Sequence, residues 1–247
     1  MTIRTLMNSQ PVPMKRKYIP TVTTTALVKQ PPRKKQFTGL VPRYRGFAPL
    51  QRPAISEVKC FDENLGAAAV PANLSAVVGT EPAAAYSGMT EINCIRQDAT
   101  VAGRIGNKVV IKSLHCKFNL TAAAVVTATV RGMLVYDRQP TGAFPAITDI
   151  LLDQPLGGAN GMGGLNISNK SRFSVIRDQY FAIDAAQSLQ IPVNWYVKGR
   201  WEVEFGANAG TIGDFRTGAI YFICFQANAA GGNANITQQN CRCRYFD

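Results

Sequence analysis

Apolar and polar residues alternate with a period of two over much of the chain after about residue 56. At residues 125–137 the even positions are mostly apolar or small, whereas the odd positions include threonine, arginine and aspartate. The same alternation runs through residues 193–197 and 201–205, with a break between them at Gly199, and through residues 241–245. A period of two predicts β-strands that have one face in a core and the other in solvent.

Other segments complete an all-β pattern. Residues 219–225 are apolar at every position, which predicts a strand in the middle of a sheet. The one helical pattern is short, with Ile147, Ile150 and Leu151 at positions i, i+3 and i+4. About eight strands with little helix predict an antiparallel sandwich, jelly roll or barrel. The remaining predicted strands lie near residues 57–61, 90–95, 108–120 and 172–183.

The formal charge of +12 is concentrated at the start of the 247-residue chain. No acidic residue precedes Glu57, and the remainder of the chain carries 16 basic and 15 acidic residues. Such segregation is typical of a basic arm that binds a polyanion, because a solubility role favours interspersed charge. We therefore expect phosphate contacts from the 11 basic residues of the arm, which are Arg4, Lys15, Arg16, Lys17, Lys29, Arg33, Lys34, Lys35, Arg43, Arg45 and Arg52.

The composition of this segment divides the chain into an arm, residues 1–55, and a domain, residues 56–247. The arm holds 8 of the 14 prolines, which predicts an extended segment without regular structure. Aromatic residues lie among its charges and suit stacking on unpaired bases. The arm contains two basic clusters, Lys15-Arg16-Lys17 and Arg33-Lys34-Lys35. Such clusters are typical of nuclear import signals and of nucleic-acid-binding patches, and the sequence is consistent with either interpretation or with both.

Other features of the sequence argue against several classes of protein. No apolar run approaches the length of a membrane span, and we expect neither a secretory leader nor a membrane partner. No catalytic or phosphate-loop motif is present, so we expect no enzyme and no cofactor. The single histidine, His115, lies inside a predicted strand and is expected to be structural. Cys241 and Cys243 have the wrong spacing for a zinc half-site and are expected to pack as thiols, so we expect no metal.

Four blocks in the domain carry a family resemblance. The segment Arg104-Ile105-Gly106-Asn107-Lys108-Val109-Val110-Ile111-Lys112-Ser113 resembles a motif in capsid proteins of small circular single-stranded DNA viruses that encode a replication-initiator protein. Glu57-Val58-Lys59-Cys60-Phe61-Asp62 resembles the opening of that family's first jelly-roll strand. In chain order, the third block runs from Val130 to Gly142 and ends with Val-Tyr-Asp-Arg-Gln-Pro-Thr-Gly. The fourth runs from Leu165 through Lys-Ser-Arg-Phe to Val175 and Arg177-Asp178. Both follow in the family's order.

The resemblance implies a single antiparallel eight-stranded jelly roll that assembles into a closed icosahedral shell of sixty copies. Its partners would be further copies of itself, a circular single-stranded DNA genome and the host import machinery. The protein would reside in the virion, and in the host nucleus during assembly. Sixty copies would bring about 660 arm cations to the lumen, enough to neutralise a sizeable share of a genome without reading its sequence.

Residues of the domain are weaker candidates for nucleic-acid contact. Arg242 and Arg244 share one face of the last predicted strand, which in a jelly roll commonly belongs to the sheet nearer the lumen. Arg104, Lys108 and Lys112 carry the motif, and either nucleic-acid contact or turn and inter-subunit contacts would explain them. Arg138 and Arg172 are expected to form structural ion pairs. Two other functions stay open: the capsid of a small satellite-type RNA virus, and a cellular nucleic-acid-binding or carbohydrate-binding β-sandwich module.

Overall fold

The strands pair into two sheets. The computed structural model describes residues 57–82, 84–122, 127–152, 161–184, 190–227 and 234–247, so the predicted arm and its boundary with the domain lie outside the described residues. The first sheet contains, in order, β1 (Lys59–Leu65), β11 (Ala234–Phe246), β5 (Lys108–Ala122), β8 (Gln190–Phe205) and β9 (Phe215–Thr217), with β2 (Ala68–Ala69) paired to β11. The second contains β3 (Val78–Gly79), β4 (Gly88–Glu91), β10 (Ala219–Gln226), β6 (Thr127–Asp137) and β7 (Phe173–Asp184).

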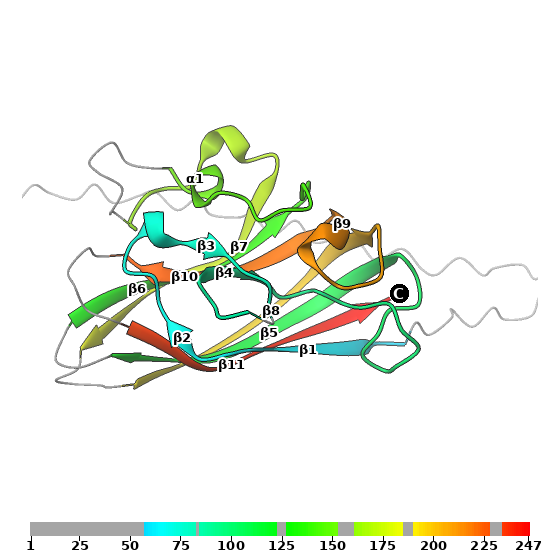
Figure 1. Cartoon of the computed structure of the whole chain (residues 1–247), viewed down its shortest axis with the longest axis horizontal. Coiled ribbons are helices and arrows are strands. Elements are labelled where there is room, and N and C mark those ends of the chain that lie inside the picture. Colours follow the sequence, from blue (N-terminus) through cyan, green and yellow to red (C-terminus); the bar gives the residue numbers. More distant parts are fainter. Residues whose placement is uncertain (1–56, 83, 123–126, 153–160, 185–189, 228–233) are drawn as a thin grey trace, which may run out of the picture. The chain divides into compact units, whose positions relative to one another are not determined.

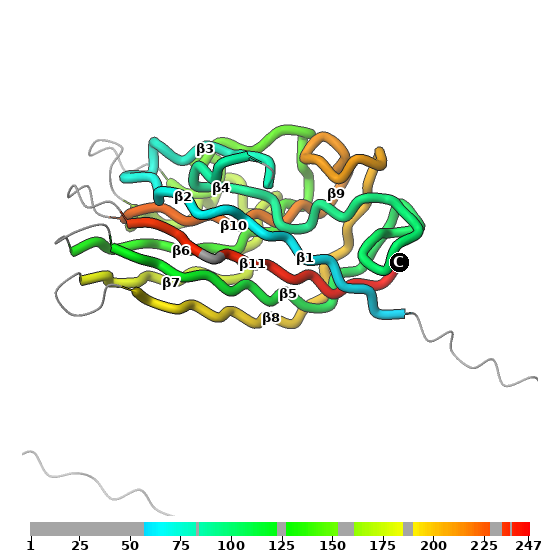
Figure 2. Tube along the Cα trace, turned by 60° about the horizontal axis from the view of Figure 1, so that its bottom comes forward, coloured from blue at the N-terminus to red at the C-terminus, as the bar shows by residue number. Residues whose placement is uncertain are grey.

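Eight of these strands form a nested set of antiparallel pairs. In chain order, β1 pairs with β11, β4 with β10, β5 with β8, and β6 with β7. One long hairpin wrapped around itself gives this nesting, and its strands then divide between the two sheets. Figure 2 shows β1, β11, β5 and β8 side by side in one of them. The arrangement is a single antiparallel eight-stranded jelly roll, which confirms the predicted fold.

The break predicted at Gly199 is wrong, because β8 is one continuous strand through that residue. A register shift between Ile111 and Ser113 of β5 lies opposite it. The Trp201 ring lies over Gly199, where a Cβ atom would come within 2.4 Å of the ring. Glycine here accommodates a bulge and a close side chain within the strand instead of ending it.

Aromatic side chains join the two sheets. Phe118 of β5 lies 5.1 Å, centroid to centroid, from both Trp195 of β8 and Phe222 of β10. Phe181 of β7 stacks on Trp195 at 6.1 Å. Gly132 of β6 provides room for this packing, since a Cβ atom there would lie 2.8 Å from the Trp195 ring. Each such aromatic pair contributes about 0.5–1.5 kcal/mol beyond the area that it buries.

The two sheets differ in what covers their outer faces. Every residue of β10 is buried, because connecting segments cover the second sheet on the side away from the core. These segments include α1 (Ile147–Ile150), which confirms the short predicted helix and lies above that sheet in Figure 1. On β8 of the first sheet, by contrast, the even-numbered residues from 190 to 202 are all exposed. The remaining short elements are η1 (Leu74–Ala76), η2 (Ile167–Asn169) and η3 (Ile212–Asp214).

Two ion pairs hold the covering segments in place. Arg131 of β6 binds both carboxylate oxygens of Asp178 on β7, at 3.0 and 2.7 Å. Its other guanidinium nitrogen donates to the carbonyl oxygens of Gly161 and Gly163, at 2.8 and 2.7 Å. Arg172 binds the fully buried carboxylate of Asp137 in the same bidentate way, through both carboxylate oxygens, at 3.0 and 2.8 Å. Each pair contains one buried charge, Arg131 or Asp137, so removing the partner of that buried charge is expected to be costly.

A buried carboxyl group lies at the end of β4. The Glu91 side chain is completely buried. Burial, with a further contribution from Glu81, raises the pKa of Glu91 from 4.5 to about 8. Burial also raises the pKa of Glu63 to about 7, although Arg96 opposes that shift. Both carboxyl groups therefore hold a proton in the folded chain at pH values where they would be ionised in the unfolded chain.

The aromatic contact between the sheets predicts a large effect of truncation. Phe118→Ala should lower the free energy of unfolding by about 3–5 kcal/mol, because it removes a buried ring and leaves a cavity. Urea denaturation measures the loss. Ile105→Ala, at a side chain that is 69% exposed, is the control and should change stability by less than about 0.5 kcal/mol. A loss below about 1 kcal/mol for Phe118→Ala would contradict this packing.

Glu91 predicts the pH dependence of stability. Since the folded-state pKa lies above the unfolded value, the contribution to stability is complete below about pH 4.5 and is lost as the pH rises through 8. The loss should be roughly 3–5 kcal/mol. Glu91→Gln should flatten this part of a denaturation series from pH 4.5 to 9, and Glu63→Gln should flatten it less. A Glu91→Gln variant that keeps the wild-type slope would refute the assignment.

Candidate nucleic-acid interface

The outward residues of β1, β11, β5 and β8 form one continuous surface, which we call the open face. Strand register places side chains in rows across it. One row contains Asp62, Arg242, His115 and Tyr196, each opposite the next on the neighbouring strand. The next row in one direction contains Cys60, Arg244, Ser113 and Lys198, and the row in the other contains Asn64, Asn240, Lys117 and Asn194.

The open face is rich in cations. Its four strands carry seven exposed basic residues and, besides the half-buried Glu63 on the core side of β1, three carboxylates. The carboxylates are Asp62, Glu202 and Glu204, and each already lies beside a cation. No carboxylate in the described ranges lies within ion-pairing distance of the other four basic residues, which are Lys112, Lys117, Lys198 and Arg244. These four have charge available for an external anion.

Aromatic rings lie among these cations. The rings of His115 and Tyr196 meet edge to face, with centroids 5.8 Å apart and planes at 86°. The ammonium group of Lys112 lies 4.7 Å from the ring centroid of Phe246. Cations for phosphate and rings for bases on one surface are the combination used by proteins that bind single-stranded nucleic acid.

Arg242 and Arg244, the two domain residues that the sequence nominates, differ in their surroundings. Both are exposed on β11. Arg242 binds both carboxylate oxygens of Asp62, at 2.6 and 2.7 Å, and this hydrogen bonding holds the pKa of Asp62 below its usual value. Arg244 has no such carboxylate partner among the described residues. Arg244 is therefore the more available of the two for a phosphate group.

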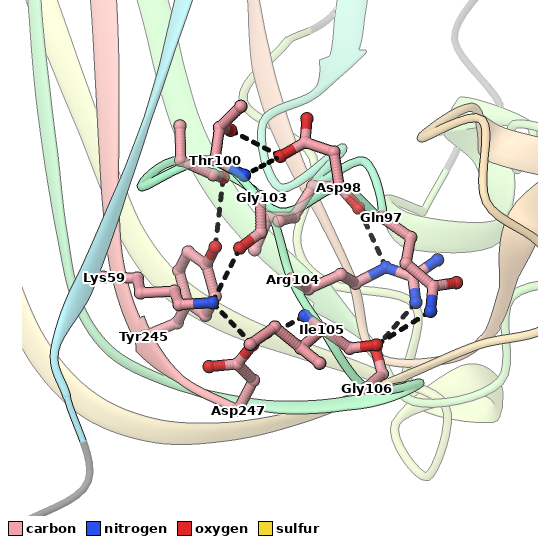
Figure 3. A network of polar contacts seen from close by, with 12 residues as sticks. Lys59, Gln97, Asp98, Thr100, Gly103, Arg104, Ile105, Gly106, Tyr245 and Asp247 are labelled. Carbon is pink, nitrogen blue, oxygen red and sulfur yellow. Dashed lines mark hydrogen bonds and ion pairs between the residues drawn. The ribbon is translucent and has the colours of Figure 1, made fainter.

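Arg104 does not belong to this surface. Its side chain is completely buried, with the guanidinium 4.2 Å from the Phe205 ring centroid. It donates to the carbonyl oxygens of Ile95 at 3.0 Å and Gly106 at 2.7 Å, and also to that of Ala207. Of the two roles open for Arg104, the structure supports the turn contact, since these bonds fix the loop between β4 and β5 (Figure 3).

The same loop is fastened to the start of β1 and to the end of β11. The Lys59 ammonium donates to Gly103 O and to an Asp247 carboxylate oxygen, each at 3.0 Å. That carboxylate also accepts the Ile105 amide at 2.7 Å, and the Tyr245 hydroxyl donates to Ala102 O at 3.0 Å. Figure 3 shows these contacts as one network. The family-like residues Lys59 and Arg104 thus fix the loop from opposite sides.

The other residues that the sequence analysis named have structural surroundings. The predicted ion pair of Arg172 is confirmed, whereas Arg138 donates to Ser171 O at 2.9 Å instead of pairing with a carboxylate. His115 shares a 2.7 Å hydrogen bond with Asn194. Cys241 and Cys243 are buried free thiols, as predicted. Lys108 lies 3.3 Å from Glu204. The 11 arm residues and both basic clusters lie outside the described residues.

Among the described residues, no group of three or more His, Cys, Asp or Glu side chains could hold a metal ion. In the same part of the chain, no helix has the length and apolar character to cross a membrane.

Sequence reasoning missed part of the interface. Lys117, Lys198 and Tyr196 all occupy outward positions of strands whose alternation is visible in the sequence. The available signal was whether each residue falls on the odd or the even positions of its strand, which decides the face it occupies. This signal identifies a shared surface only when the strand register shows that the outward residues are neighbours.

No protein-family model matches the chain, and no curated protein matches it. Among solved structures, a chain of the full particle of Israeli acute paralysis virus, heated to 63 degrees, is similar at a TM-score of 0.29 and 8% identity, covering 99% of this chain and 88% of that chain. A chain of the empty particle of Kashmir bee virus at acidic pH gives 0.28 and 12%, covering 98% and 89%. The jelly-roll assignment therefore rests on strand order and not on these low scores.

The open face predicts how charge substitutions change binding to a single-stranded oligonucleotide. Arg244→Gln with Lys117→Gln should lower the slope of log affinity against log salt by about 1.4, at about 0.7 for each phosphate contact. Asp62→Asn should raise affinity, because it frees Arg242 and removes a negative charge. Fluorescence anisotropy over a salt series measures both effects.

Arg177→Gln is the matched control for these variants, because Arg177 is an exposed arginine of the other sheet whose side chain donates a hydrogen bond to Gln179 and forms no ion pair among the described residues. It should leave the salt slope unchanged. Open-face variants that behave like Arg177→Gln would show that nucleic acid does not contact this surface.

Proposed function

We propose that the chain is a viral coat protein. Its jelly-roll domain assembles into a closed icosahedral shell, and its basic arm packages the genome. The observation that carries the proposal is the combination of a nested eight-stranded jelly roll with a preceding segment that holds 11 basic and no acidic residues. A rigid sandwich presents the same edges and loops on every copy, as symmetric assembly requires. A basic segment neutralises phosphate without reading sequence.

We further propose that the genome is circular single-stranded DNA. Support comes from how the family-like blocks meet in space. Lys59 of the first block and Arg104 of the second hold one loop. The third and fourth blocks bind each other through Arg131 with Asp178 and through Asp137 with Arg172. Residues far apart in the sequence thus act as paired parts of one framework, which is a stronger ground for the resemblance than four separate turn motifs.

The nuclear stage of assembly follows from the same proposal. A DNA virus that replicates in the nucleus needs its coat protein imported, and Lys15-Arg16-Lys17 and Arg33-Lys34-Lys35 have the composition of import signals. The protein then has three kinds of partner: further copies of itself in a sixty-subunit shell, the genome, and the host import machinery. Its role is structural and not enzymatic.

Electron microscopy of the purified chain tests the proposed function. We expect closed shells of uniform diameter, with nuclease-protected nucleic acid inside. Digestion of the extracted nucleic acid by a DNase and not by an RNase supports the DNA virus, and the reverse result supports a satellite-type RNA virus. A stable monomer at every salt concentration and pH would contradict the coat-protein proposal and favour a cellular binding module.

Deletion of residues 1–52 tests the role of the arm. The variant should keep the thermal midpoint of the domain but should no longer co-purify with DNA, because it loses 11 cations. Its salt slope for single strands should fall from at most about 10 to about 3, which is the share of the four unpaired open-face cations. A scrambled arm of the same composition is the matched control and should package normally. Unchanged DNA content after the deletion would contradict the role of the arm.

A further inference from the structure

We propose that Tyr196 is a stacking platform for an unpaired base, so that the open face distinguishes single-stranded from double-stranded nucleic acid. The inference rests on the proposed function, because it names the form of nucleic acid that the shell domain takes. The arm can neutralise phosphate on any nucleic acid, whereas a ring that stacks on a base needs a base that is not already stacked in a duplex.

The position of Tyr196 follows from the packing of its neighbours. Trp195 is buried between the sheets, 5.1 Å from Phe118. Because adjacent residues of a strand point to opposite faces, the burial of Trp195 sends the Tyr196 side chain outward. There it is 51% exposed, although tyrosine can bury its ring readily elsewhere in this chain, as Tyr221 does. The core therefore fixes an exposed ring at this point of the open face.

The surroundings of the ring supply what a nucleotide requires. His115 packs edge to face with Tyr196, and its 2.7 Å hydrogen bond to Asn194 holds it there. The Lys198 ammonium lies 5.9 Å from the Tyr196 ring centroid, and no carboxylate of the described residues pairs with it. The Tyr196 ring, packed against His115 and beside a cation that has no carboxylate partner, can take a base and its phosphate together, with little ordering left to be done on binding.

The two exposed tyrosines, Tyr180 and Tyr196, differ in what surrounds their rings. These two are the aromatic side chains among the exposed large apolar residues of the described chain. Tyr180 lies on β7 of the other sheet, where the Arg131 guanidinium covers its ring at 5.0 Å and itself binds Asp178. The cation over the Tyr180 ring is therefore held in place by an ion pair. The cation near the Tyr196 ring, Lys198, has no carboxylate partner among the described residues.

The experiment uses the full-length chain and two ligands of equal length, a single strand and a duplex, each with one 2-aminopurine. Tyr196→Ala should weaken single-strand binding by about 5-fold or more, since stacking on one aromatic contributes about 5- to 150-fold per base. Duplex binding should not change. The quenching of 2-aminopurine fluorescence that reports stacking should fall in the variant. Because the arm binds both ligands, the readout is the ratio of the two affinities.

Two further variants complete the test. Tyr196→Phe keeps the ring, so it should retain both the affinity ratio and the quenching, and it keeps the test valid if Tyr196→Ala unfolds. Tyr180→Ala is the matched control on the other sheet and should leave the ratio unchanged. A Tyr196→Ala variant that is folded and keeps the wild-type ratio, or that loses single-strand and duplex affinity equally, would overturn the inference. Failure of the proposed function looks different, because then neither the wild type nor any variant forms shells, whatever its affinity for nucleic acid.

Discussion

The register of β8 against β5 couples the core of the molecule to its surface. Pairing of Cys116 with Trp195 sets Trp195 inward against Phe118, and the next pair along, His115 with Tyr196, then faces outward. On β11 the buried Cys241 and Cys243 place Arg242 and Arg244 outward in the same way. A shift of one residue would expose the aromatic core and bury the cations, so the packing energy of the core also specifies the chemistry of the open face.

The two sheets perform different tasks because their outer faces are covered differently. The second sheet is covered on its outer side over β10, whereas β7 at its edge is partly exposed. Charged residues of this sheet and its connections bind each other, as Arg131 binds Asp178 and Arg172 binds Asp137. The first sheet has a core on one side and solvent on the other, which leaves its outward side chains available to a ligand. The paired arginines hold the framework, and the unpaired cations of the open face are the ones that can bind.

The sequence predicted most strands, the short helix and the all-β class, because each of these depends on a pattern of apolar residues within one short segment. It could not predict that Arg104 is buried, since that depends on carbonyl oxygens from Ile95 and Ala207, which only the folded chain brings together. The predicted break at Gly199 is wrong for a related reason. The glycine accommodates a bulge and the Trp201 ring, and neither can be recognised from the sequence of one strand. The open face needed the register of four strands, whereas the charge of the arm is evident from composition alone.

In the proposed function, the arm and the open face would make different electrostatic contributions to binding. The chain after the arm has 16 basic and 15 acidic residues, so its net charge is close to zero and it attracts a polyanion little from a distance. Its excess of cations is local to one face, where screening limits the attraction to about 10 Å. On this proposal the arm, with 11 cations and no carboxylate, would capture nucleic acid first. The short-range contacts of Lys198, Arg244 and Tyr196 would then select the form of the strand that reaches the open face.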